Sequence, residues 1–130
     1  MAFLFQNLRV YQQALAFADG ASTLTAGFPR ASWYLADQLN RASLSIALNI
    51  AESTGRVTNG DRRRFLIIAR GSAHECAALL DMCGRKRVLS DVQCAELGEH
   101  LVTISKMLSG MIRRYGGSEA VGEAQEEYTP

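Results

Sequence analysis

The chain has 130 residues, the usual length of one domain, and 48% of them are apolar, as in proteins that bury a core of their own. Prolines are few while alanine, leucine, arginine and glutamate are frequent, so the composition favours helices over sheets. The net charge of +1 hides an asymmetry. Four of the 13 acidic residues and none of the 14 basic residues follow residue 115, which leaves a moderately basic main part.

No uninterrupted apolar run is long enough to cross a membrane, and the N-terminus lacks the pattern of a secretory signal. The three cysteines, Cys76, Cys83 and Cys94, form no C-x-x-C pair and cannot all pair within one chain. We therefore expect a cytoplasmic protein whose thiols are small buried side chains, without a metal or another cofactor.

Four helices are predicted in chain order. The first spans residues 6–25 and stops at Gly27-Phe28-Pro29, with a core stripe of Leu8, Tyr11, Leu15, Ala18 and Ser22. The second spans residues 30–54 and ends at Gly55. Its expected core stripe is Leu35, Leu39, Ala42, Ile46, Asn49, Ile50 and Ser53.

The third helix follows the turn at residues 57–60, with Thr58 as its cap, and Gly84 is the expected left-handed stop. Its expected core stripe is Phe65, Ile68, Ala69, Ser72, Cys76, Leu79, Leu80 and Cys83. The fourth opens with the capping box Ser90-Asp91-Val92-Gln93 and closes at Gly116-Gly117. Its core stripe is Leu97, Leu101, Ile104, Leu108, Met111 and Ile112.

Short connections between long helices make neighbouring helices antiparallel. The sequence therefore predicts an all-α fold, an up-down-up-down four-helix bundle over residues 1–115. Residues 116–130 are predicted to form an acidic, disordered tail.

The second helix is apolar on two sides, since Leu44, Ala47, Leu48 and Ala51 lie opposite its core stripe. One small bundle covers one face of each helix, so these four residues are candidates for the interface of a homo-oligomer. Burial of both faces within one chain is the alternative.

Polar residues are mixed into the second and third helices at core-like spacing. If the two helices fold back around residues 57 and 58, positions whose numbers sum to about 115 lie side by side. Arg41 then meets Glu75, and Glu52 meets Arg63 or Arg64. We expect a structural polar network of Arg41, Asn49, Glu52 and Glu75, whose net contribution to stability is small because desolvation offsets the Coulomb attraction.

Catalytic patterns are missing, and we predict that the protein is not an enzyme. The histidines, His74 and His100, show no triad pattern, and no Glu-x-x-His pair recurs on two helices as a di-metal site requires. Glu96 and His100 share a helix face, which is more typical of a solvated pair than of a metal site. No glycine loop matches a phosphate-binding motif.

Basic residues cluster at both ends of the third helix and favour binding of phosphate backbones, with a solvated helix surface as the alternative for each cluster. The nucleic-acid-binding candidates are Arg56, Arg62, Arg63, Arg70, Arg85, Lys86 and Arg87. No base-reading motif accompanies them, so any binding would be salt-sensitive and weakly sequence-specific.

The sequence resembles a bacterial four-helix-bundle family that includes proteins encoded in intervening sequences of large-subunit ribosomal RNA genes. The segments that carry the resemblance are Leu8-Arg9-Val10-Tyr11-Gln12, Phe28-Pro29, Gln38-Leu39-x-Arg41-Ala42-Ser43-x-Ser45-Ile46, Asn49-Ile50-Ala51-Glu52, Gly55-Arg56, and Arg64-Phe65-Leu66-x-Ile68-Ala69-x-Gly71-Ser72 with Glu75. The family also looks related to the accessory variability determinant of diversity-generating retroelements, a basic partner of a reverse transcriptase and nucleic acid. Ser53 departs from the family pattern, which usually has glycine there. The resemblance implies the bundle fold and a ring-shaped pentamer.

Two functions follow as hypotheses. The first is a non-enzymatic homo-oligomer, a pentamer by the resemblance, that binds RNA or a ribonucleoprotein through the arginine clusters. The second is a protein-interaction or structural module without nucleic-acid affinity, whose arginines serve internal ion pairs.

Overall fold

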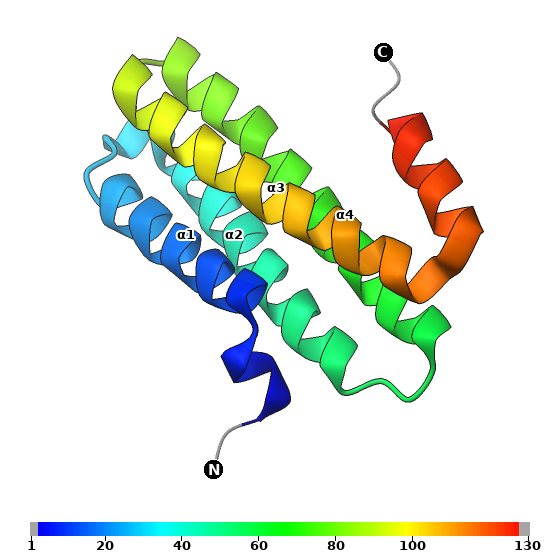
Figure 1. The fold of residues 1–130 in the computed structure, drawn as a ribbon. Helices are drawn as coiled ribbons and strands as arrows, with labels where there is room; N and C mark the ends of the chain where they lie inside the picture. Colours follow the sequence, from blue (N-terminus) through cyan, green and yellow to red (C-terminus); the bar gives the residue numbers. More distant parts are fainter. Residues whose placement is uncertain (1–2, 128–130) are drawn as a thin grey trace.

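The computed structural model describes residues 3–127 of the chain, and the side chains of residues 3–116. Four α-helices run in alternating directions along one bundle (Figure 1): α1 (Arg9–Thr25), α2 (Trp33–Thr54), α3 (Asn59–Arg85) and α4 (Asp91–Glu127). Two short 3₁₀ helices, η1 (Leu4–Asn7) and η2 (Arg30–Ser32), precede α1 and α2. The predicted all-α, up-down-up-down bundle is confirmed.

Local capping chemistry sets the starts of α3 and α4. The hydroxyl oxygen of Thr58 accepts a hydrogen bond from the Asp61 amide at 3.1 Å. At α4 the bonds are reciprocal, since the Gln93 amide donates to the Ser90 Oγ at 3.1 Å and the Ser90 amide donates to the Gln93 Oε1 at 2.9 Å. These bonds satisfy amides that have no partner within the helix, as both predicted caps require.

The end of α3 differs from the prediction. The helix passes through Gly84 to Arg85, and the left-handed position is Arg87, with φ of 59°. The Val88 amide donates to the Cys83 carbonyl and the Arg87 amide to the Gly84 carbonyl, which is the hydrogen-bond pattern of a Schellman motif. Gly84 instead permits a close approach, because a Cβ there would lie 3.2 Å from the Cys94 sulfur on α4.

The end of α4 also differs from the prediction, because the helix continues through Gly116-Gly117 to Glu127. Its last turns point in a different direction from the rest of the helix (Figure 1). Glycines tolerate such a change of direction because they carry no side chain to crowd the preceding turn. The predicted boundary between bundle and tail near residue 116 stays a prediction.

The buried face of α1 is not the predicted stripe. The buried residues are Val10, Ala14, Phe17, Ala21 and Thr25. Leu15, which we expected in the core, is exposed, as is Ser22. In α2 and α4 the predicted aliphatic stripes are confirmed, with Leu39, Ile46, Ile104 and Leu108 all fully buried.

Each pair of neighbouring helices shares a side-chain hydrogen bond. Asn40 of α2 donates to Thr25 of α1 at 3.0 Å, and Ser45 of α2 bonds to Ser72 of α3 at 2.8 Å. The other two pairs are Arg70 of α3 with Ser109 of α4 at 3.0 Å, and His100 of α4 with Gln13 of α1 at 2.7 Å. Because a buried polar group without a partner is costly, such bonds help to fix how neighbouring helices align.

Candidate nucleic-acid interface

The strongest concentration of arginines lies where α2 turns into α3. Arg56 follows the last turn of α2 and forms an ion pair with Glu52 one turn earlier. Its guanidinium lies 4.4 Å from the centre of the Phe65 ring, and the guanidinium of Arg64 lies 4.6 Å from the same ring. Arg64 also approaches Asp61 at 4.0 Å. Phe65, predicted as a core residue, is half-buried and serves as the surface against which both guanidinium groups rest.

The part of α4 that packs on α3 finishes near Tyr115, at the same end of the bundle as the start of α3. Arg62 donates to the Asn59 side chain at 3.2 Å, and its guanidinium lies 5.9 Å from the Tyr115 ring. Arg113 and Arg114, just before Tyr115, are exposed there. Our candidate residues omitted both, although the antiparallel course of the third and fourth helices already places the end of one beside the start of the other. We call this arginine-rich region the basic end; its members are Arg56, Arg62, Arg64, Arg113 and Arg114. The candidate Arg63 lies beside them, but its Nε and NH2 are buried, so it presents little of its guanidinium group to solution.

Arg70 is a wrong candidate for nucleic-acid binding. It is the largest of the fully buried side chains, with 2% of its surface exposed, and it donates to the Ser109 Oγ. Helix geometry puts Arg70 on the same side of α3 as Arg63, two turns away. That side forms the seam with α4, however, so a phosphate in solution cannot reach Arg70.

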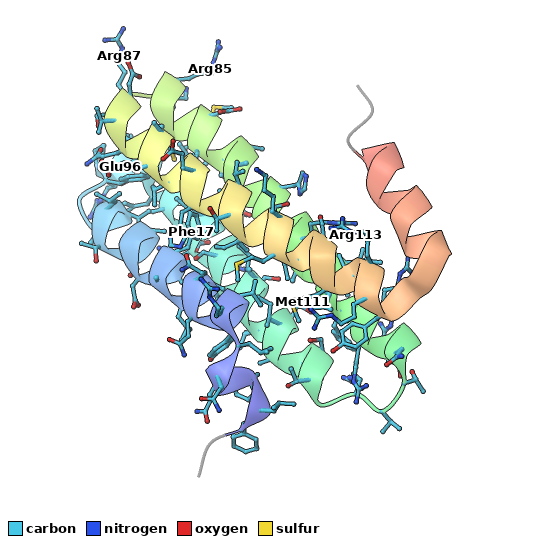
Figure 2. All side chains as sticks on the ribbon, viewed as in Figure 1. Phe17, Arg85, Arg87, Glu96, Met111 and Arg113 are labelled. Atoms are coloured by element: carbon cyan, nitrogen blue, oxygen red, sulfur yellow. The ribbon has the colours of Figure 1, made fainter. Side chains whose placement is uncertain are left out.

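The second cluster lies at the opposite end of the molecule. Arg85, Lys86 and Arg87 are exposed at the turn between α3 and α4, and Figure 2 shows Arg85 and Arg87 at one end of the bundle and Arg113 towards the other. At 1.5 Å per residue, the helix between the two clusters is about 40 Å long. One short segment of nucleic acid therefore cannot contact both clusters of one chain.

The predicted polar network forms differently. Arg41 pairs with Asp37 at 3.3 Å, one turn away on the exposed side of α2, and does not reach Glu75. Glu52 pairs with Arg56 in place of Arg63 or Arg64, and Asn49 donates to the carbonyl oxygen of Ser45 within α2. The predicted alignment of α2 with α3 was nearly right. The positions of the bonded pair Ser45 and Ser72 sum to 117, close to the predicted sum of about 115.

The candidate interface residues of α2 divide into two groups. Leu44 and Leu48 have exposed fractions of 54% and 57%, although both are large apolar side chains. Ala51, beside them, is half-buried. Ala47 is only 2% exposed and belongs to the core of the chain, so it is not available to a second subunit.

An open groove of about 620 Å³ runs along α3 and α4. Small and aliphatic side chains supply most of its lining, including Ala73, Ala77, Gly98, Leu101 and Val102. Polar and basic groups complete it; they are His74, Ser105, Lys106, Ser109 and Arg113. We call this feature the α3/α4 groove. Sequence reasoning missed it, because its small residues give no strong apolar signal.

The pair Glu96 and His100 does not form a metal site in this structure. The Nε2 of His100 lies 2.7 Å from the Gln13 Oε1, and its ring meets the edge of Phe17 at 5.8 Å between centres. Among the described residues, no group of three or more His, Cys, Asp or Glu side chains could hold a metal ion. The thiols of Cys76 and Cys83 are buried, and burial raises the pKa of Cys76 to about 12.

Burial lowers the pKa of His100 below its usual value of 6.5, and the hydrogen bond with Gln13 offsets this in part. The unfolded chain therefore binds a proton more readily than the folded one, and stability falls as the pH falls through about 6.5. Urea titrations at pH 7.5 and 5.5 measure this fall in the free energy of unfolding. We expect it to be smaller for His100→Gln than for the wild type. Equal losses in wild type and His100→Gln would contradict the assignment.

Together these features define an antiparallel four-helix bundle with a basic end and an apolar groove, and the described residues contain no helix long and apolar enough to span a membrane. The chain belongs to the 23S rRNA-intervening sequence protein family, whose model matches residues 6–110. The predicted relation to the accessory variability determinant stays a prediction.

A solved structure supports the fold independently. A protein of unknown function from the S23 ribosomal protein family of Bacteroides thetaiotaomicron VPI-5482 superposes with a TM-score of 0.76 at 24% identity. The match covers 80% of this chain and 98% of that protein. At this identity the likeness concerns the fold alone. Comparison with curated proteins finds no match.

Proposed function

We propose that this protein is a non-enzymatic, cytoplasmic homo-oligomer that binds structured RNA through its basic end. The family description refers to the intervening sequence of 23S rRNA, which makes RNA the first ligand to test. The resemblance to ring-shaped family members makes a pentamer the assembly to test.

The arrangement of arginines at the basic end carries the proposal. Five arginines from α3, α4 and the α2–α3 turn lie at this end, against the carboxylates of Glu52 and Asp61. Arg56 and Arg64 rest on Phe65, which restricts their guanidinium groups before any ligand arrives. A planar guanidinium held in place loses less conformational entropy on binding and can donate two hydrogen bonds to one phosphate.

Assembly would multiply this weak attraction. A single cluster of a few arginines gives modest, salt-sensitive affinity for a phosphate backbone. In a ring, every copy contributes the same cluster at the same rim, so one folded RNA could contact several clusters at once.

The test is a titration of fluorescent structured RNA at several salt concentrations. The triple variant Arg56→Gln/Arg62→Gln/Arg64→Gln is expected to bind at least about tenfold more weakly than the wild type at low salt. The slope of log affinity against log salt should become shallower by about 2, since each lost phosphate contact changes it by roughly 0.7 to 0.9.

The matched control removes the same charge at the other end, as Arg85→Gln/Lys86→Gln/Arg87→Gln. We expect it to change affinity and slope much less. Equal weakening by both variants would contradict the assignment to the basic end, and the absence of binding by wild type at low salt would contradict RNA binding altogether.

The α3/α4 groove favours a second candidate function, a protein-interaction module without affinity for nucleic acid. An apolar groove between two helices is a surface on which another helix can bind. The same titration separates the two functions, because this module would remain assembled and show no RNA binding at low salt.

A further inference from the structure

Two of the exposed apolar surfaces in the described part of the chain lie on different helices. The first is the ridge formed by Leu44 and Leu48 on the outer side of α2, each more than half exposed. The second is the α3/α4 groove, whose lining is mostly apolar. Exposed apolar surfaces of this kind mark places where another molecule binds.

The shapes of the two surfaces are complementary. Leu44 and Leu48 are one helical turn apart and project as two adjacent knobs. Ala73, Ala77 and Gly98 line the groove with little side-chain volume, and a Cβ added at Gly98 would meet nothing within 4 Å. Small residues on facing helices let a third helix approach until its larger side chains fill the space between them.

The lengths also agree. The ridge and its flanking charges extend along α2 from Asp37 to Glu52, and the α4 side of the groove extends from Gly98 to Arg113. Each stretch advances fifteen positions along a helix, or about 22 Å. One helix face can therefore occupy the groove over its whole length.

The charges favour the ridge over a second groove as the occupant. The groove carries Lys106 and Arg113, so two grooves facing each other would bring like charges together. The ridge is flanked by the carboxylates of Asp37 and Glu52, whose side chains are 62% and 53% exposed. Each carboxylate is paired with an arginine, Arg41 or Arg56, so this flank adds no net positive charge to the contact.

The two surfaces face different directions on one chain. In the described part of the molecule α2 packs against α1 and α3, and α4 packs against α3 and α1, so α2 and α4 are diagonally opposed. The ridge on α2 thus cannot reach the groove of its own chain. A surface on one copy that fits a different surface on the next makes a head-to-tail contact. Such contacts form a ring when the rotation between copies closes, and a filament when it does not.

We propose that the Leu44–Leu48 ridge of one copy occupies the α3/α4 groove of the next copy. This inference rests on the homo-oligomer of the proposed function and adds which two surfaces meet. In a closed ring every copy then uses its ridge once and its groove once, and both of these apolar surfaces are covered.

The test is cross-linking between two different single-cysteine additions, Leu48→Cys and Ala77→Cys. Both sites are exposed, whereas Cys76 and Cys83 are buried and Cys94 is replaced by alanine to remove its partly accessible thiol. Light scattering first establishes that each protein is assembled. We then expect a short bismaleimide to cross-link a re-equilibrated mixture of the two proteins, and neither protein alone.

Ala16→Cys, an exposed position on α1 away from both surfaces, is the matched control and should not cross-link to Leu48→Cys. Three outcomes would overturn the pairing while leaving the assembly intact: no cross-link in an assembled mixture, cross-linking of Leu48→Cys to itself, or an equal yield with Ala16→Cys. A monomeric wild-type protein in light scattering would instead overturn the assembly on which the pairing rests.

A second measurement uses variants that keep the fold, as circular dichroism would verify. Leu48→Glu places a charge on the ridge, and Ala77→Trp fills the groove. Each is expected to weaken self-association by at least tenfold in sedimentation equilibrium. Glu75→Gln, on an exposed position of α3 outside the groove lining, is the control and should leave self-association unchanged. Unaltered assembly of both Leu48→Glu and Ala77→Trp would contradict the proposal.

Discussion

Replacing Arg70 with alanine is expected to lower the free energy of unfolding by about 2 to 4 kcal/mol, the scale of a lost buried side chain together with its hydrogen bonds. Arg70 is almost completely buried between α3 and α4, and its NH1 donates to the Ser109 Oγ. Truncation removes the largest buried side chain of the seam and takes a donor from that hydroxyl. The midpoint of a urea titration measures the loss.

The matched control is Arg64→Ala on the same helix, where the side chain is 60% exposed. We expect Arg64→Ala to change stability by no more than about 0.5 kcal/mol. The two variants should behave in the opposite way towards RNA. Under conditions where both are folded, Arg64→Ala weakens binding and Arg70→Ala does not. An equal stability loss in the two variants would contradict the burial of Arg70.

Replacing Phe17 with alanine is expected to cost about 3 to 5 kcal/mol, a large share of the roughly 5 to 15 kcal/mol by which a domain of this kind is stable. Phe17 has no exposed surface and meets the edge of the His100 ring on α4. Its removal leaves a cavity at the contact between α1 and α4, which is the least extensive of the four contacts between neighbouring long helices.

Leu15→Ala provides the comparison, because the sequence stripe placed Leu15 in the core and the structure exposes it. We expect Leu15→Ala to cost less than about 1 kcal/mol. If its urea midpoint fell as far as that of Phe17→Ala, the face of α1 that packs on the bundle would be the predicted one and not the observed one.

The elements that could be predicted are those with strong local signals. Large aliphatic residues at helical spacing identified the buried faces of α2 and α4, and Thr58 and Ser90 identified the starts of α3 and α4 through hydrogen bonds within one turn. In α1 the signal was weak because alanines are spread around the helix. Several of its faces are then nearly equally apolar, and contacts with α2 and α4 decide which one is buried.

The candidate site was harder to predict, because exposure depends on neighbours that sequence spacing does not reveal. Arg63 and Arg70 do share one side of α3, but only the position of Ser109 on α4 shows that Arg70 is enclosed. The predicted ion pairs failed because closer partners were available. Arg41 forms an ion pair with Asp37 on the same helix, and Glu52 forms one with Arg56 just after that helix; each partner is one turn away. An i, i+4 pair loses less side-chain freedom than a pair across two helices.

The up-down-up-down path also bears on how quickly the chain can fold. The two most extensive helix contacts, α2 with α3 and α3 with α4, join elements that follow each other along the chain. The contact between α1 and α4 is the exception, and it closes the bundle across nearly the whole sequence. Chains in which most contacts join elements that are neighbours in the sequence fold within microseconds to milliseconds, because little loop entropy is lost before those contacts form. The ridge and the groove exist only in the folded bundle. If the proposed ring forms, rapid folding would complete both surfaces before two copies meet, so the ring would assemble from complete bundles.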